Sequence, residues 1–214
     1  MTKYLIVGDV WSEAEENAGR SFVGGTGQVL RGMLSQAGIA PDTCHFTSVF
    51  RKRPAGGRLE SFGGPKAEAL PGWPKLNKIF VHKNLAPELD RLAEEIRAVK
   101  PDIILALGVV ALWALCKRSG IKKHRGSPLL THDGEWKVLP TYSPGTVLHQ
   151  WPLRPIVVTD MSKAVYEASF PGLRRPKRLI YIEPSIKDLW WFHDKYIAPA
   201  SSVSCDIETK QHRS

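Results

Sequence analysis

Residues 6–30 read IVGDVWSEAEENAGRSFVGGTGQVL, and this stretch decides the fold. It opens with apolar residues typical of a buried strand, which ends at Gly8. An acidic segment, which we interpret as a loop, leads to the glycine-rich run GRSFVGGTG at 19–27, where a helix with apolar spacing begins. Glycines around one aromatic residue, Phe22, let the backbone approach a ligand closely and place open amides beside a flat ring. We therefore expect this loop to bind a flat, ring-shaped group.

Apolar runs alternate with amphipathic segments along most of the chain. Strands are expected near 4–8, 44–50, 102–107 and 136–139, and helices near 27–37, 86–99, 108–118 and 154–168. This order predicts an α/β fold of three layers (αβα), in which a central, mainly parallel sheet of four to five strands carries helices on both faces. Ligands of such sheets lie at the carboxyl ends of the strands. The Gly- and Pro-rich segment 54–83 predicts a long loop or insertion.

Four segments carry a resemblance to one family. Residues 8–30 resemble the first motif of the uracil-DNA glycosylases, in the branch that normally holds an iron–sulfur cluster. Residues 45–54, HFTSVFRKRP, resemble the family's second strand and its exit, and residues 139–148, LPTYSPGTVL, resemble its late loop. Residues 100–108, KPDIILALG, are similar to its central strand, so the resemblance spans roughly residues 3–165. It implies the glycosylase fold, DNA as the partner and base excision as the chemistry.

The resemblance implies roles for residues of the first motif. A uracil glycosylase flips the base out, stacks it, stabilises the charge that develops on it and places water against the sugar. Phe22 would be the stacking platform, and Asp9 would hold the water. Gly8 would adjoin the base, and backbone amides would contact the phosphate or base at Gly24, Gly25 and Gly27. Two alternatives stay open: Phe22 as a core residue, and Asp9 as a helix cap or loop acceptor.

The sequence departs from the family at three places in the implied site. Ser48 stands where the family has Asn, and Ser143 stands where it has the His that donates to the uracil oxygen. Trp11 replaces a proline, and its indole would fill space that the base needs. We therefore expect a DNA-binding domain with weak or lost base excision. One alternative is an active glycosylase of altered base specificity, and another is a structural or protein-interaction module.

The net charge of +9 indicates an acidic partner. Basic runs that flank the glycosylase-like motifs predict phosphate contacts by Arg51, Lys52, Arg53, Lys122, Lys123 and Arg125, although such runs are also typical of solvated faces. Val147 and Leu148 follow Ser143 at the spacing of the family's apolar wedge, which enters the DNA stack. Core packing is the alternative for both residues.

Cysteine usage bears on the cofactor. The 3 cysteines, Cys44, Cys116 and Cys205, are far apart, which argues against a disulfide framework. The family's cluster takes four cysteines, including an amino-terminal pair that is absent here, and Lys52 occupies one ligand position. We expect no iron–sulfur cluster and no other cofactor. No apolar run approaches the roughly 20 residues of a membrane span, so we expect a cytoplasmic protein, located in the host cytoplasm if the chain is phage-encoded.

The carboxy-terminal part has a different character. We expect a glycosylase-like domain over 1–170, a linker with a helix over 171–200, and the first strand of a truncated exonuclease domain over 201–214. Asp206 and Glu208 lie two apart on an apolar segment, so both carboxylates would face one side of a strand, as a two-metal site requires in a complete domain. The segment resembles the first exonuclease motif of family-A DNA polymerases. The implied partner is the remainder of a phage-type polymerase, and a solvated strand face is the alternative.

Overall fold

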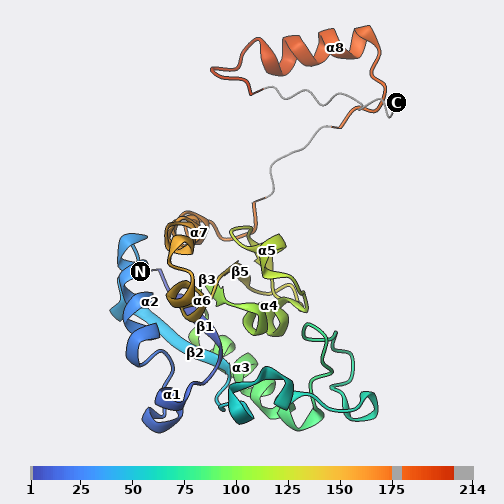
Figure 1. The fold of residues 1–214 in the computed structure, drawn as a ribbon. Helices are drawn as coiled ribbons and strands as arrows, with labels where there is room; N and C mark the ends of the chain where they lie inside the picture. Colours follow the sequence, from blue (N-terminus) through green and yellow to red (C-terminus); the bar gives the residue numbers. More distant parts are fainter. Residues whose placement is uncertain (1, 175–179, 205–214) are drawn as a thin grey trace, which may run out of the picture. The chain divides into compact units, whose positions relative to one another are not determined.

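The computed structural model describes residues 2–174 and 180–204. The chain divides into two compact units, Met1–Arg174 and Arg175–Ser214, and we describe each by itself (Figure 1).

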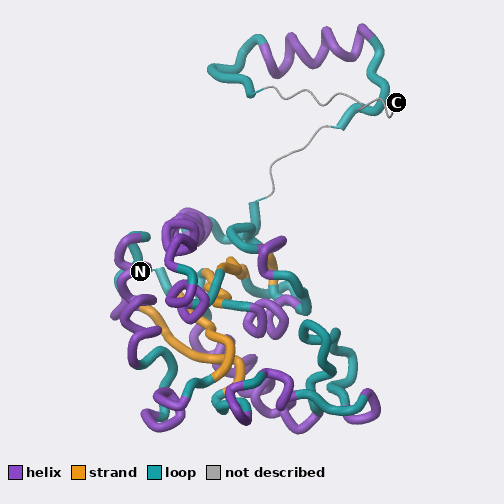
Figure 2. The backbone as a smooth tube through the Cα atoms, in the orientation of Figure 1, coloured by secondary structure: helices purple, strands orange, loops and turns teal. Residues whose placement is uncertain are grey.

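One mixed sheet forms the centre of the first unit (Figure 2). Its strands follow the order β2-β1-β3-β5-β4, and all neighbouring pairs are parallel except β4 with β5. The strands are β1 (Tyr4–Val10), β2 (Cys44–Phe50), β3 (Ile103–Leu107), β4 (Leu129–Leu130) and β5 (Lys137–Thr141). The expected mainly parallel α/β sheet is confirmed, and the short antiparallel strand β4 is an addition to it.

Helices cover both faces of this sheet. Alternate side chains of β1 point to opposite faces, so that Leu5 and Val7 join one apolar cluster while Tyr4 and Ile6 join another. The first cluster includes residues of α3 (Ala86–Val99) and α4 (Val109–Cys116). The second includes residues of α2 (Gly24–Gln36), α6 (Pro144–His149) and α7 (Arg154–Ala168). This arrangement is the expected three-layer αβα architecture.

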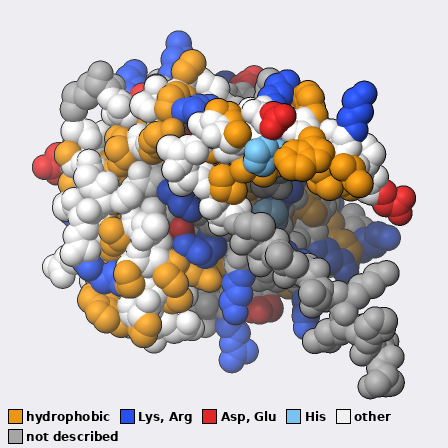
Figure 3. All heavy atoms as spheres, turned by 90° about the horizontal axis from the view of Figure 1, so that it is seen from above, with side chains coloured by type: hydrophobic (Ala, Val, Ile, Leu, Met, Phe, Trp, Pro, Cys, Tyr) orange, Lys and Arg blue, Asp and Glu red, His pale blue; other side chains and the backbone are white. Residues whose placement is uncertain are grey.

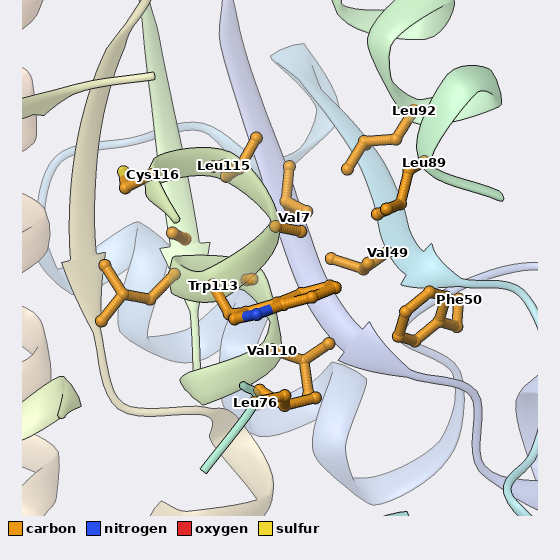
Figure 4. Close-up of a cluster of buried hydrophobic side chains, with 14 of the residues drawn as sticks. Val7, Val49, Phe50, Leu76, Leu89, Leu92, Val110, Trp113, Leu115 and Cys116 are labelled. Carbon is orange, nitrogen blue, oxygen red and sulfur yellow. The ribbon is translucent and has the colours of Figure 1, made fainter. Parts of the chain in front are cut away.

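The Gly- and Pro-rich segment is ordered against α4. Trp113 of α4 is fully buried, and Figure 4 shows its indole among apolar side chains that include Val49, Phe50 and Leu76. Its Nε1–H donates to the Pro74 carbonyl at 2.8 Å. Truncating such a buried aromatic residue typically costs about 3–5 kcal/mol. An apolar anchor with one hydrogen bond therefore holds the long loop on this face.

Helix α1 (Glu13–Ala18) was not expected, because we interpreted its acidic sequence as a loop. Ser12 and Glu15 form a capping box, a pairing that is recognisable in sequence as Ser followed three residues later by Glu. Acidic residues in the first turn also stabilise the helix, because their negative charge lies at the positive end of the helix dipole. The helix ends at Gly19, which has a φ of 62°; this left-handed conformation favours glycine. A further short helix, α5, spans Ile121–His124.

The second unit contains α8 (Ile186–Phe192), and helical backbone continues to Ile197. Ser185 and Asp188 cap the start of α8. Ile186 and Trp190 are exposed, and Figure 3 shows hydrophobic side chains open to solvent beside charged ones on the face that it presents. Asp206 and Glu208 lie outside the described residues, so the exonuclease interpretation stays a prediction. No helix in the described part of the chain is long and apolar enough to cross a membrane.

Candidate functional site

A hollow of about 260 Å³ lies where the parallel strands end. Such a volume is just below the roughly 300–1,000 Å³ of drug-sized ligand sites, so one small ring suits it. The hollow brings together segments that are far apart in the sequence, and its lining residues are Gly8, Asp9, Val10, Ser12, Glu15, Phe22, Thr26, Ser48, Leu107, Ser143, Pro144 and Gly145. Asp9, Phe22, Ser48 and Ser143, which the sequence predicts as site residues, therefore share one cavity.

Phe22 both lines this hollow and belongs to the core. It has a φ of 58°, which is unusual for a residue with a side chain, and it is 8% exposed. Its ring packs so closely on Gly8 that an added Cβ there would lie 2.7 Å from the ring carbon Cζ. A Cβ on Gly27 would lie 1.9 Å from the Phe22 carbonyl oxygen. Gly8 and Gly27 thus serve close packing around Phe22, and Gly27, which is buried, does not present an open amide as expected.

Glu15 also lines the hollow, although it is not among the site residues that the sequence predicts. Its carboxylate is buried and accepts hydrogen bonds from the Phe22 N–H at 2.6 Å, the Ser12 N–H at 2.8 Å and the Ser12 hydroxyl at 2.7 Å. The capping-box spacing of Ser12 and Glu15 was the available signal. Through these contacts α1 determines the backbone position of Phe22.

Asp9 lies at the end of β1 against the first turn of α4. Its Oδ1 accepts hydrogen bonds from the N–H groups of Val110 and Ala111, each at 2.9 Å. Gly108 makes room for the carboxylate, because a Cβ there would lie 2.2 Å from Oδ2. Burial raises the pKa of Asp9 to about 6, and the backbone donors oppose that rise. The carboxylate is therefore mostly ionised at neutral pH, with a pKa close to that of an efficient general base.

Ser48 ends a short chain of polar contacts. The Trp11 Nε1–H donates to Ser21 Oγ at 2.9 Å, and Ser21 Oγ lies 2.9 Å from Ser48 Oγ. If the Ser21 hydroxyl donates to Ser48, then the Ser48 hydroxyl can donate to a bound base. Trp11 is absent from the described lining of the hollow, so the expectation that its indole fills the base's space is not supported.

Ser143 lines the hollow and also caps α6. Its Oγ accepts from the Thr146 N–H at 3.2 Å and lies 2.9 Å from Thr146 Oγ1. Further along α6, Val147 is fully buried in the core, whereas Leu148 is 44% exposed. A side chain buried in this way cannot enter a DNA stack without unfolding α6, so the wedge role is corrected to core packing for Val147 and stays open for Leu148.

Several of the predicted phosphate contacts are already used within the protein. Arg51 donates to Glu95 at 2.8 Å, and Arg53 lies 2.8 Å from Glu13. Arg125 donates to Asp160, whose side chain is 1% exposed. These carboxylates would compete with a phosphate, most strongly for Arg125, because the side chains of Arg51 and Arg53 are 37% and 42% exposed. Phosphate contact by the three arginines stays a prediction. The other predicted contacts are exposed, namely Lys52, Lys122, Lys123, Gly24 and Gly25.

The described residues do not fit an iron–sulfur cluster. They include no group of three or more His, Cys, Asp or Glu side chains able to hold a metal ion. Cys44 packs against the apolar core under α2, whereas Cys116 belongs to the apolar core on the opposite face of the sheet. Burial raises the pKa of the Cys44 thiol to about 11 and that of Cys116 to about 12, which disfavours the thiolate that a metal needs. Cys205 lies outside the described residues.

Comparisons with known proteins agree with this geometry. The family model described as "Uracil DNA glycosylase superfamily" matches residues 1–166. A Type-4 uracil-DNA glycosylase of Thermotoga maritima is 32% identical over 167 residues, which cover 76% of this chain and 76% of that protein. A Type-4 uracil-DNA glycosylase of Sulfurisphaera tokodaii is 28% identical over 167 residues, which cover 74% of this chain and 67% of that protein. The chain belongs to the uracil-DNA glycosylase superfamily.

Proposed function

We propose that this protein is a DNA glycosylase that hydrolyses the N-glycosidic bond of uracil or another modified base. The observation that carries the proposal is the meeting of Asp9, Phe22, Ser48 and Ser143 in one hollow at the strand ends. The names of the Type-4 relatives support the same chemistry. This proposal is the active-enzyme alternative, which the relatives support better than a DNA-binding domain with weak or lost base excision.

The reaction follows from the placement of these groups. A flipped base would stack on Phe22, and the Asp9 carboxylate would orient a water molecule and accept its proton. The water oxygen bonds to the sugar C1′ as the C1′–N bond breaks, and the bonding electron pair leaves with the base. The hydroxyls of Ser48 and Ser143 would donate toward the base oxygens while that charge develops. The base anion finally takes up a proton from solvent.

The same geometry predicts a slow reaction on uracil. A serine hydroxyl is shorter than an imidazole, and that of Ser143 is shared with Thr146. Losing one donor of this kind typically costs about 10²–10³ in rate. This observation favours a second candidate function, a DNA-binding domain whose excision is weak or lost.

A fusion partner is a further part of the proposal. The resemblance of residues around Asp206 and Glu208 to an exonuclease motif supports attachment of this domain to a family-A DNA polymerase. In that arrangement, residues 1–170 would form the glycosylase domain, 171–200 the linker, and 201–214 the start of the exonuclease domain. A protein-interaction role within such a polymerase is the remaining alternative.

Excision assays on single- and double-stranded oligonucleotides test the proposal. The substrates carry uracil, hypoxanthine or xanthine, and alkaline cleavage reports abasic products. We expect excision that is lost in Asp9→Asn, while binding to an abasic-site analogue is retained. Binding without excision of any base would favour the second candidate, and the absence of both would contradict both candidates.

A further inference from the structure

A second hollow, of about 460 Å³, lies between the start of α2 and the amino end of β2. It is lined by Arg20, Ser21, Phe22, Val23, Gly24, Gly27, Gln28, Arg31, Cys44, His45 and Phe46. Phe22 lines both this hollow and the base site. A molecule that occupies one hollow therefore has the other directly beside it.

The charge in this hollow has one sign. Its described lining contains two guanidinium groups, Arg20 and Arg31, and no carboxylate. Arg31 lies over the Phe46 ring, 4.9 Å from its centroid, and its only described carboxylate contact is with the fully exposed Asp42 at 4.0 Å. Arg20 makes no salt bridge with any described residue. These two arginines thus differ from Arg51 and Arg125, whose charges are taken up by carboxylates of the fold.

The backbone of this hollow is open to close approach. Gly24, which lines the hollow, is exposed, and a Cβ built on it would meet no atom within 4 Å. The exposed amide of Gln28 adds a further hydrogen-bond donor on the same helix. Donors and positive charge without a carboxylate are the chemistry that recognises a phosphodiester, and guanidinium groups pair with phosphate oxygens in a bidentate manner.

We propose that the Arg20–Arg31 hollow binds a backbone phosphate of the DNA strand, next to the nucleotide whose base stands against Phe22. This inference rests on the proposed function, because it takes the neighbouring hollow as the base site. The shared wall supports it: because Phe22 lines both hollows, the sugar–phosphate backbone of a nucleotide whose base stands against Phe22 would lie within reach of the neighbouring hollow. The hollow would then fix the register of the strand without reading its sequence.

A salt titration of DNA binding tests the phosphate site. The double variant Arg20→Gln/Arg31→Gln is compared with the unmodified protein on a duplex that contains a non-hydrolysable abasic-site analogue. We expect affinity to fall about tenfold or more at low salt, since charge-assisted hydrogen bonds to the phosphate are removed. The slope of log K against log salt should decrease by about 0.7–0.9 for the one phosphate released.

The matched control is Arg97→Gln/Arg118→Gln, which also removes two positive charges. Arg97 is exposed on α3, and Arg118 is exposed just after the end of α4; both helices lie on the face of the sheet opposite α2. Unchanged affinity and slope in the Arg20/Arg31 variant, or an equal change in the control, would overturn the proposal. The proposal would also be overturned if the two arginines were needed to bind free deoxyuridine monophosphate but not to bind DNA. If the unmodified protein excises no base but the slope still changes, the phosphate site stands and the proposed excision fails. Circular dichroism and thermal melting establish that each variant is folded.

Discussion

The Glu15 carboxylate accepts a hydrogen bond from the Phe22 backbone N–H across 2.6 Å, and this contact joins helix α1 to the ring that lines the proposed base site. Phe22 has a φ of 58°, a conformation that typically costs a residue with a side chain about 1–3 kcal/mol. The cost is offset by a buried carboxylate that also accepts two hydrogen bonds from Ser12. An acidic residue to which we assign no part in bond cleavage thus sets the geometry of the proposed stacking platform.

Substituting Glu15 by Ala should therefore weaken both stability and substrate binding. It leaves the buried Phe22 N–H without an acceptor, so we expect the free energy of unfolding to fall by about 1–3 kcal/mol. We also expect KM to rise, because Phe22 can leave its strained position. Urea unfolding and excision kinetics measure the two effects. Glu16→Ala on the same helix is the control, because Glu16 is exposed. Equal losses in both variants would show that α1, rather than the Glu15–Phe22 contact, matters.

Excision should depend on the ionisation of Asp9. Because burial raises the pKa of Asp9 to about 6, the carboxylate that accepts the proton predominates above pH 6 and is lost below it. We expect kcat/KM to rise with pH through about 6 and then to level off. In Asp9→Asn the rate should fall at every pH, and the rise of kcat/KM with pH should disappear. If kcat/KM of Asp9→Asn still rose with pH through about 6, the titration would belong to another group.

The same carboxyl group should affect stability with the opposite sign. A carboxyl whose pKa is higher in the folded than in the unfolded protein binds its proton more tightly when folded, so its contribution to stability decreases as pH rises from about 4 to about 6. Asn keeps an oxygen that can accept from Val110 and Ala111 but carries no charge. Asp9→Asn should therefore remove part of the pH dependence of the unfolding free energy. Unfolding titrations in urea from pH 4 to 8 measure this difference.

The basic residues should separate into structural and DNA-binding groups. Arg125→Gln leaves the buried Asp160 carboxylate without its charged partner, and we expect a loss of about 3–5 kcal/mol in the free energy of unfolding. Lys122→Gln/Lys123→Gln should leave stability within about 0.5 kcal/mol. The lysine variant should flatten the salt dependence of DNA binding, with the slope decreasing by about 0.9 for each phosphate that a lysine no longer neutralises. An unchanged slope would remove these lysines from the DNA interface.

The sequence predicts the sheet well because buried parallel strands have strong local signals. Residues 103–107 are apolar throughout, and the structure buries every one of them in β3. Helix α1 shows what local sequence patterns do not reveal. Its capping box is a local signal, but its burial of Glu15 against Phe22 depends on chain packing that no periodicity reveals.

The site was only partly predictable for a related reason. The resemblance to the family's motifs located Asp9, Ser48 and Ser143, which meet because the ends of parallel strands share one edge of the sheet. It also located Phe22, which reaches the same hollow from the turn between α1 and α2. Charge runs were a poorer guide, because the sequence does not show which arginines have carboxylate partners. Arg51 and Glu95 are 44 positions apart, yet they lie 2.8 Å from each other. In contrast, Arg20 and Arg31 belong to no basic run, and only the fold brings them together.

Leu148 should act on double-stranded DNA alone if it is the wedge. Its side chain is exposed, so Leu148→Ala should change stability by less than about 0.5 kcal/mol. Excision from a duplex should slow, because base flipping loses its wedge, while excision from a single strand is unchanged. Val147→Ala is the contrasting variant and should lose about 2 kcal/mol of stability, since Val147 is fully buried. Equal slowing on both substrates would contradict the wedge role.

Restoring the two family donors should raise the rate on uracil. Ser48→Asn adds an amide that can donate to and accept from the uracil edge, and Ser143→His adds the imidazole donor. Loss of the Ser143 cap should cost about 0.5–2 kcal/mol of stability, so activity is compared well below the melting temperature. We expect the double variant to excise uracil about 10²–10³ faster than the unmodified protein, and each single variant to gain less. The gain should vanish when Asp9→Asn is added, which shows that the restored donors work through the same water. A double variant that folds but gains nothing would mean that the groups around Ser48 and Ser143 do not face a uracil, and would direct the search to other bases.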